Sequence, residues 1–173
     1  MRLASVGELV DSVSSWNPSR SPDAAFTYID LSAVDNDTKR IVGAVSLAGA
    51  QAPSRARQIV AAGDVLVSTV RPNLNAVALV PAALDGAIAS TGFTVLRPGK
   101  QLDGRFLFHW VRCPAFIDDM VRKATGASYP AVSDRIVKES PVPLPPLPEQ
   151  RNVAAILDSA DALRAKRRQV LAH

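Results

Sequence analysis

The 173-residue sequence has one cysteine, two histidines and few aromatic side chains. Because Cys113 stands alone, an internal disulfide and a cysteine-rich metal site are excluded, and we expect a reducing, cytoplasmic setting with no bound metal. No apolar run approaches the roughly 20 residues of a membrane-spanning helix, so no membrane partner is expected. Apolar residues make up 47% of the chain and charged residues 21%, which is typical of a globular protein with one domain and an appended element.

Motifs of known catalytic chemistry are also missing. There is no phosphate-binding loop, GAVSLAGA lacks dinucleotide-binding glycine spacing, and the segment NPSR is not the signature of a base methyltransferase. His109 lies in an aromatic helical pattern, which is more typical of a packed histidine than of a general base. Since no nucleophile–base pair can be identified, we expect no catalytic residue, no cofactor and no enzymatic activity. An enzyme with an unrecognised site remains an alternative.

Basic charge is concentrated in particular parts of the chain, whose net charge is +4. Residues 39–71 carry five basic side chains against Asp64 alone, and residues 97–139 carry eight against five acidic ones. This distribution indicates a folded face that meets a polyanion. A solvated surface with a mild basic excess is the alternative.

Hydrophobic periodicity predicts an α+β fold. Runs rich in apolar and β-branched residues at 25–31, 63–70, 76–81 and 86–98 indicate a curved, mostly antiparallel sheet, with the last strand bent at Gly92. Helical patterns follow at 104–113, 114–125 and 132–139, and Pro114 suits the first turn of the second helix. The aromatic residues of these helices are expected in the core.

The C-terminal segment begins with four prolines between Pro143 and Pro148, which predict an extended, stiff strut. Pro148 suits the first turn of a long helix. Along this helix apolar positions recur at alternating steps of three and four, as in a coiled coil; they are Val153, Ile156, Ala160, Leu163 and Val170. We expect a domain over residues 1–142, and a strut with a partner-binding helix over residues 143–173.

Several stretches, in the same order, resemble the DNA-specificity subunits of type I restriction–modification systems. GDVLVSTVRPNLNAVALV and IASTGFTVLRP resemble the Gly-Asp strand motif and the strand that follows it. Residues 106–133 resemble the helix pair and Gly-Ser/Ala-x-x-Pro loop of that family. The most specific stretch, VPLPPLPEQRNVAAILDSADAL, resembles the junction between a target recognition domain and its conserved spacer helix.

This resemblance implies a non-catalytic subunit that binds double-stranded DNA and directs a methyltransferase–nuclease complex to its target. The spacer helix would pair with a second such helix and dock onto modification (methyltransferase) subunits, and a restriction subunit is a further candidate partner. Complete members carry two recognition domains and two helices. With one of each, this chain is expected to be a half-subunit that forms a homodimer, or a fragment. An adaptor or regulator that binds no DNA is the alternative.

Two polar loops are the candidate DNA contacts. Arginine can pair with guanine and asparagine with adenine in the major groove, and the first loop offers Ser68, Arg71, Asn73 and Asn75. The second loop offers Thr125, Ser128 and Tyr129, next to Arg122 and Lys123 for phosphate contacts. The alternatives are a plain hairpin turn for the first loop and a helix C-cap at Gly126 for the second. Arg55 and Arg57 are left as either phosphate contacts or solvated side chains.

Overall fold

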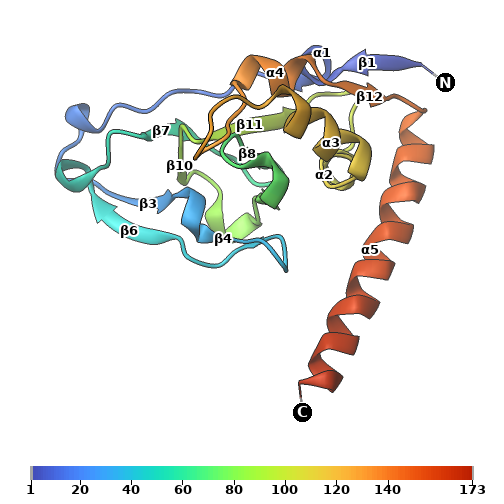
Figure 1. Ribbon diagram of the computed structural model, residues 1–173. Coiled ribbons are helices and arrows are strands. Elements are labelled where there is room, and N and C mark those ends of the chain that lie inside the picture. Colours follow the sequence, from blue (N-terminus) through green and yellow to red (C-terminus); the bar gives the residue numbers. More distant parts are fainter. Residues whose placement is uncertain (1, 173) are drawn as a thin grey trace.

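The computed structural model describes residues 2–172 and confirms the predicted α+β class (Figure 1). The strands, which are mostly antiparallel, are divided between two four-stranded sheets and two short pairs. The first sheet has the order β6 (Val45–Ala48), β3 (Ala25–Ile29), β10 (Ile88–Ser90) and β7 (Ala56–Ile59). The second has the order β2 (Val10–Asp11), β11 (Phe93–Pro98), β8 (Val65–Ser68) and β9 (Val77–Leu79). The short pairs are β1 (Leu3–Ser5) with β12 (Pro141–Pro143), and β4 (Val34–Asp35) with β5 (Arg40–Ile41).

The run at 86–98, predicted as one bent strand, is two strands that belong to different sheets. The chain leaves β10 at Ser90, turns through Thr91 and Gly92, and enters β11 at Phe93. Gly92 is buried against Leu31, whose side chain would lie only 2.8 Å from an added Cβ. The Gly92 amide donates to the Ser90 hydroxyl, which tightens this turn. A larger residue at position 92 would require the Leu31 side chain to shift, so this glycine lets the chain pass close to Leu31 where it changes sheet. The parallel pairing of β10 with β3 is the exception to the antiparallel pattern among the described strands.

Strand β8 has a hydrophobic core on each of its faces. Val65 and Val67 point into a core shared with the helices, whereas Leu66 points into a core between the two sheets. Alternating side chains of a strand point to opposite faces, so a strand buried on both faces becomes continuously apolar. This burial explains the uninterrupted apolar run VLV in the sequence.

Four short helices lie on one side of the sheets; they are α1 (Val6–Leu9), α2 (Gly104–Trp110), α3 (Pro114–Lys123) and α4 (Asp134–Glu139). The Asp103 side chain caps α2 by accepting from two backbone amides, and the Ser133 hydroxyl caps α4. Pro114 opens α3, as predicted. The phenylalanines of α2 and α3 are buried, as predicted.

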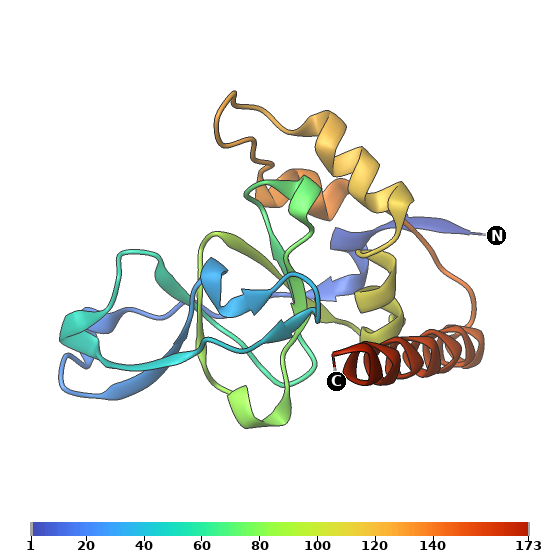
Figure 2. The same ribbon diagram turned by 60° about the horizontal axis from the view of Figure 1, so that its bottom comes forward.

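The last helix, α5 (Leu147–Leu171), is a separate rod along one side of the domain (Figures 1 and 2). It begins with Pro148 in its first turn, as predicted. Pro143, the first proline of the predicted strut, belongs to β12, which pairs with β1. The Leu144 amide extends this pairing by donating to the Arg2 carbonyl. None of the described helices is long and apolar enough to cross a membrane.

Thr94 provides a test of the core. It lies on β11 opposite Val67, it is fully buried, and its hydroxyl has no hydrogen-bond partner within residues 2–172. An unsatisfied buried hydroxyl costs about 1 kcal/mol or more. Thr94→Val should therefore raise the free energy of unfolding by about 1 kcal/mol in urea denaturation. Thr69→Val is the control and should lower it, because the Thr69 hydroxyl donates to the Gly92 carbonyl. Equal effects of the two changes would contradict this account.

Candidate nucleic-acid interface

Five strands of the two sheets begin or end at the same edge of the domain. Strands β3 and β10 are parallel and end together, while the antiparallel strand β7 begins opposite Ser90. In the second sheet, β11 begins opposite the end of β8. Two backbone hydrogen bonds join the loops along this edge, from Thr91 to the Arg55 carbonyl and from Thr69 to the Gly92 carbonyl. We call the loops 53–55, 69–75, 91–92 and 125–131 the loop edge.

The two loops predicted to contact DNA lie side by side at this edge. Arg71 donates its amide to the Pro130 carbonyl at 2.7 Å, and Val70 pairs with Ala131 in an isolated β-bridge. The Arg71 guanidinium lies over the Tyr129 ring, 4.6 Å from its centroid. This is the geometry of a cation–π contact. The two candidate loops are therefore in direct contact.

Two residues of the first loop are held by contacts inside the domain. Ser68 is buried, and its hydroxyl bonds to the backbone of Val70. The Asn75 side-chain amide donates to the Val111 carbonyl, and the Asn75 carbonyl accepts from Lys39. In contrast, Arg71 and Asn73 are exposed. Ser68 and Asn75 thus shape the loop, while Arg71 and Asn73 face outward from it.

The second loop is a tight hairpin. Thr125 and Ala131 exchange both backbone hydrogen bonds, and Gly126 adopts a φ of +106°. Helix α3 ends earlier, at Lys123, and its C-cap Ala124 is extended, so the alternative interpretation of Gly126 as the C-cap is wrong. An added Cβ at Gly126 would lie 3.0 Å from the Tyr129 carbonyl oxygen. Gly126 closes the hairpin, leaving the side chains of Thr125, Ser128 and Tyr129 exposed.

Arg122 and Lys123 lie on the last turn of α3, directly before this hairpin. Both pair with Asp119, at 3.3 Å and 2.7 Å, and their side chains are 75% and 44% exposed, whereas that of Asp119 is 19% exposed. Both cations therefore reach the surface beside the hairpin, where a phosphate group could contact them.

Arg55 also lies on the loop edge, a position that the sequence did not reveal. It is exposed, and its carbonyl accepts the bond from Thr91 in the turn between β10 and β11. The segment PSRAR shows a basic loop but not the edge to which it belongs. Its placement requires the register of β7 against β10, which is a long-range property.

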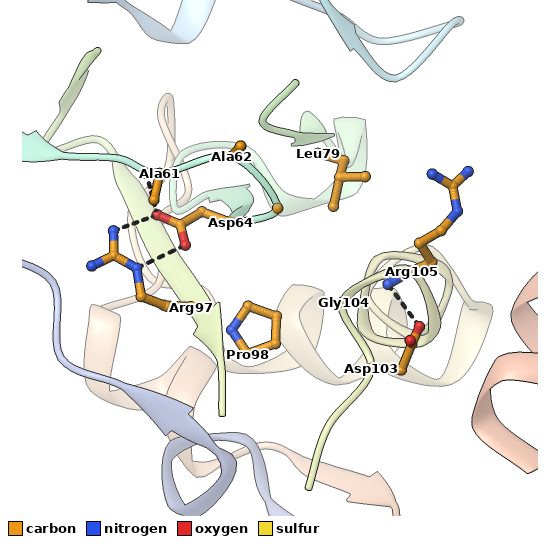
Figure 3. A pocket seen from close by; sticks show the side chains of 10 residues that line it. Ala61, Ala62, Asp64, Leu79, Arg97, Pro98, Asp103, Gly104 and Arg105 are labelled. Atoms are coloured by element: carbon orange, nitrogen blue, oxygen red, sulfur yellow. Dashed lines mark hydrogen bonds and ion pairs between the residues drawn. The ribbon is translucent and has the colours of Figure 1, made fainter. Parts of the chain in front are cut away.

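A cleft of about 400 Å³ lies away from the loop edge, between the turn before β8 and the start of α2 (Figure 3). Two carboxylates line this cleft. The first, Asp64, is buried and is paired with Arg97 at 2.8 Å. The Ala61 amide also donates to Asp64. Figure 3 shows Asp103 turned instead towards the start of α2, where it accepts from the Arg105 amide. Both carboxylates are therefore engaged in holding the fold.

The start of α5 is joined to the domain through Gln150, which is fully buried. Its side-chain carbonyl accepts from the Asp103 amide at 2.8 Å. Its side-chain amide donates to the carbonyls of Gln101 and Pro145, at 3.0 and 2.8 Å. One residue thus joins α5, the proline strut and the start of α2.

Further along, ion pairs attach α5 to α2. Asp158 accepts from Arg105 at 2.6 Å and contacts His109 at 2.8 Å, while Asp161 accepts from Arg112 at 2.7 Å. The hydrogen bond from Arg105 is the main cause that lowers the pKa of Asp158. His109 is therefore a packed side chain at a helix contact.

The predicted apolar seam lies on another face of α5. At about 100° per residue, the seam is centred about 140° around the helix from the residues that contact the domain. Ile156, Leu163 and Val170 are 68%, 67% and 75% exposed. Val153 is less exposed, and Ala160 is half-buried. The described chain therefore leaves most of an apolar helical face uncovered.

The Asp158 contacts predict an acid-sensitive attachment of α5. The pKa of Asp158 in the folded protein lies below its ordinary 3.8. Its contribution to the free energy of unfolding is thus fully present above about pH 4, and it is lost as the pH falls through the folded value. Asp158→Asn should lower stability at neutral pH and flatten the decline below about pH 4. Urea denaturation at a series of pH values measures both effects, and an unchanged acid decline would contradict the role of Asp158.

Comparison with known proteins supports one family. The sequence model of the type I restriction modification DNA specificity domain matches residues 39–173. The specificity subunit of the type I restriction enzyme EcoDI from Escherichia coli is 29% identical over 114 residues, which cover 64% of this chain and 24% of that protein.

Solved structures agree with this match. The HsdS subunit from Thermoanaerobacter tengcongensis is 39% identical and superposes with a TM-score of 0.88 over 97% of this chain and 44% of its own. A chain from a structure of type I R-M complex assembly and conformational transition is 38% identical, with a TM-score of 0.89 over the same shares. This chain therefore spans less than half the length of these relatives. The match over most of the sequence and the shared fold show that the chain belongs to the type I restriction–modification DNA specificity family, with one target recognition domain and one long helix.

Proposed function

We propose that this chain recognises a specific DNA sequence through the loop edge and directs a type I methyltransferase–nuclease complex to that site. The observation that carries the proposal is the contact between the two candidate loops, where Arg71 lies over Tyr129 at an exposed edge. Membership of the family supports the DNA-recognition role. The direction of a complex, like every activity of the longer relatives, is part of the proposal.

The residues of the loop edge, and Ser68, Arg122 and Lys123 next to it, have different proposed roles. In this proposal Arg71 pairs with guanine and Asn73 with adenine. Thr125, Ser128 and Tyr129 contribute further polar contacts on the neighbouring hairpin. Arg122, Lys123 and Arg55 supply phosphate contacts, which position the domain without reading sequence. Ser68 and Asn75 act indirectly, by holding the first loop.

The proposed role of α5 is assembly. Its exposed seam fits a second helix of the same kind, from another copy or from another part of a longer chain, and the modification subunits would dock on this helix pair. The helix has 25 residues, hence a length of about 37 Å at about 1.5 Å per residue. Two recognition domains held by such a pair would lie about one DNA turn apart, close to the roughly 34–36 Å spacing of half-sites.

The alternative, an adaptor that assembles through α5 without binding DNA, is supported by the same exposed seam. A gel-shift measurement with the chain bound to methyltransferase subunits separates the two functions. Binding of duplex DNA that tracks sequence supports recognition, whereas assembly without such binding supports the adaptor.

Substitutions at and next to the loop edge should separate base recognition from phosphate binding. Arg71→Ala should weaken binding to the selected sequence by about 1–3 kcal/mol and relax the preference at one base pair. Lys123→Ala should weaken selected and random duplexes about equally and reduce the salt dependence. Fluorescence anisotropy at several salt concentrations measures both effects, on a duplex enriched from a random pool by the unmutated chain. If both variants lose selected and random DNA in the same proportion, the assigned roles are wrong.

Substitutions on α5 should separate assembly from folding. Ile156→Asp combined with Leu163→Asp should leave a folded domain, because both side chains are exposed in the single chain. The double variant should lose helix pairing and recruitment of modification subunits, since charges would enter an apolar contact. Ala162→Asp is the matched control, because Ala162 is exposed but lies outside the seam. Light scattering and co-purification measure the result. Unchanged mass and recruitment in the double variant would exclude the seam as the contact.

A further inference from the structure

Three residues with an unusual backbone conformation lie in the first loop of the loop edge or contact it. Lys39, Arg71 and Asn75 have φ angles of 55°, 49° and 48°, and they are the non-glycine residues with positive φ in the described chain. Such conformations are unfavourable for most side chains and persist where surrounding contacts enforce them. Arg71 and Asn75 flank the helical turn Pro72–Leu74, so both ends of this turn depend on such contacts.

Lys39 provides the contact at one end. It lies in the turn between β4 and β5, and its ammonium group donates to the Asn75 carbonyl at 2.5 Å. It is half-buried, and within residues 2–172 no carboxylate lies close enough to form an ion pair with it. Desolvation, followed by the charge of Arg112, lowers the pKa of the Lys39 ammonium. Because the Lys39 ammonium is half-buried and has no ion-pair partner among these residues, its hydrogen bond to the Asn75 carbonyl is a specific contact.

Two routes lead from this contact to α5. On the first, the Asn75 amide binds the Val111 carbonyl at 2.9 Å, and the next residue, Arg112, binds Asp161 of α5. On the second, the turn that carries Lys39 also contains Asp37, whose carbonyl accepts from Arg168 of α5 at 3.3 Å. Figures 1 and 2 both show this turn beside the C-terminal half of the helix.

We propose that Lys39 is a positioning residue that joins the 71–75 loop to α5, so that the loop keeps its conformation only while α5 is packed on the domain. Docking of α5 and the arrangement of Arg71 and Asn73 would then be coupled. The link to sequence reading rests on the proposed function, whereas the coupling between loop and helix does not.

Amide hydrogen exchange tests the coupling without DNA. The Leu74 and Asn75 amides are bonded within the loop, to the carbonyls of Arg71 and Pro72. In the full chain, Lys39→Met should speed exchange of these two amides by about threefold or more, the size expected for coupled contacts. Arg40→Met removes the neighbouring exposed cation and should leave both rates unchanged.

The same amides test the route through α5. Asp161→Asn combined with Arg168→Met should speed their exchange by a similar factor. The matched control, Asp134→Asn with Arg167→Met, removes one carboxylate on α4 and one exposed cation on α5, and it should have no effect. Unchanged exchange in the Asp161/Arg168 variant would overturn the proposal, as would an equal acceleration throughout the domain.

Measurements of DNA binding test whether Lys39 affects the recognition of DNA sequence. Lys39→Met should reduce the ratio of affinities for the selected and random duplexes, while Arg40→Met should leave this ratio unchanged. An equal loss for both duplexes in Lys39→Met would make Lys39 a phosphate contact and overturn its positioning role. If the unmutated chain selects no sequence, the proposed function fails, but the exchange measurements still decide whether loop and helix are coupled.

Discussion

The side chain of Gln150 is fully buried where the long helix meets the domain, and both ends of its amide are bonded to backbone groups. A buried amide without such partners would be costly, so its three bonds define how the start of α5 sits on α2. The ion pairs of Asp158 and Asp161 extend this arrangement along the helix. With one face of α5 occupied by polar contacts to its own domain, the apolar face must point elsewhere. The uncovered seam is a consequence of this attachment.

At the loop edge, the corresponding constraint is the set of backbone bonds that ties the hairpin 125–131 to the end of β8. These bonds bring together a loop that follows a strand and a loop that follows a helix, separated by more than 50 residues in the sequence. Backbone bonds tolerate changes of side chain, because the side chains take no part in them. The scaffold can therefore keep its shape while exposed positions such as Asn73 and Ser128 vary, which suits the proposed role in distinguishing DNA sequences.

Local patterns in the sequence were sufficient for the elements whose signals are local. The apolar run VLV, the placement of Pro114 and Pro148, and the spacing along α5 each predicted an element that the structure contains. The prediction of one bent strand at Gly92 was wrong, because a change of sheet depends on which distant strands pair with β10 and β11. The polar face of α5 was also missed, since Gln150 and Asp158 resemble ordinary surface residues until their partners, before α2 and on α2, are known.

The candidate site also combines features that the sequence shows locally with features that depend on tertiary contacts. Both polar loops were visible in the sequence, but not their contact through Arg71 and Tyr129, which requires tertiary structure. Nor could composition separate exposed Asn73 from Asn75, whose side chain binds the Val111 carbonyl. Lys39 carries no local signal, and the basic segment around Arg55 does not show the edge to which it belongs, because both positions follow from strand pairing across the domain.

The most direct test of the account is where duplex DNA contacts the protein. Backbone amide chemical shifts of the isotope-labelled chain, recorded during titration with a duplex enriched from a random pool, report this along the whole chain. The account predicts shifts concentrated in residues 69–75 and 125–131, with smaller ones at 53–55. Residues 99–101, which follow β11 at the opposite edge, should be unaffected. Shifts confined to that opposite edge or to the exposed face of α5, with the loop edge unchanged, would contradict it.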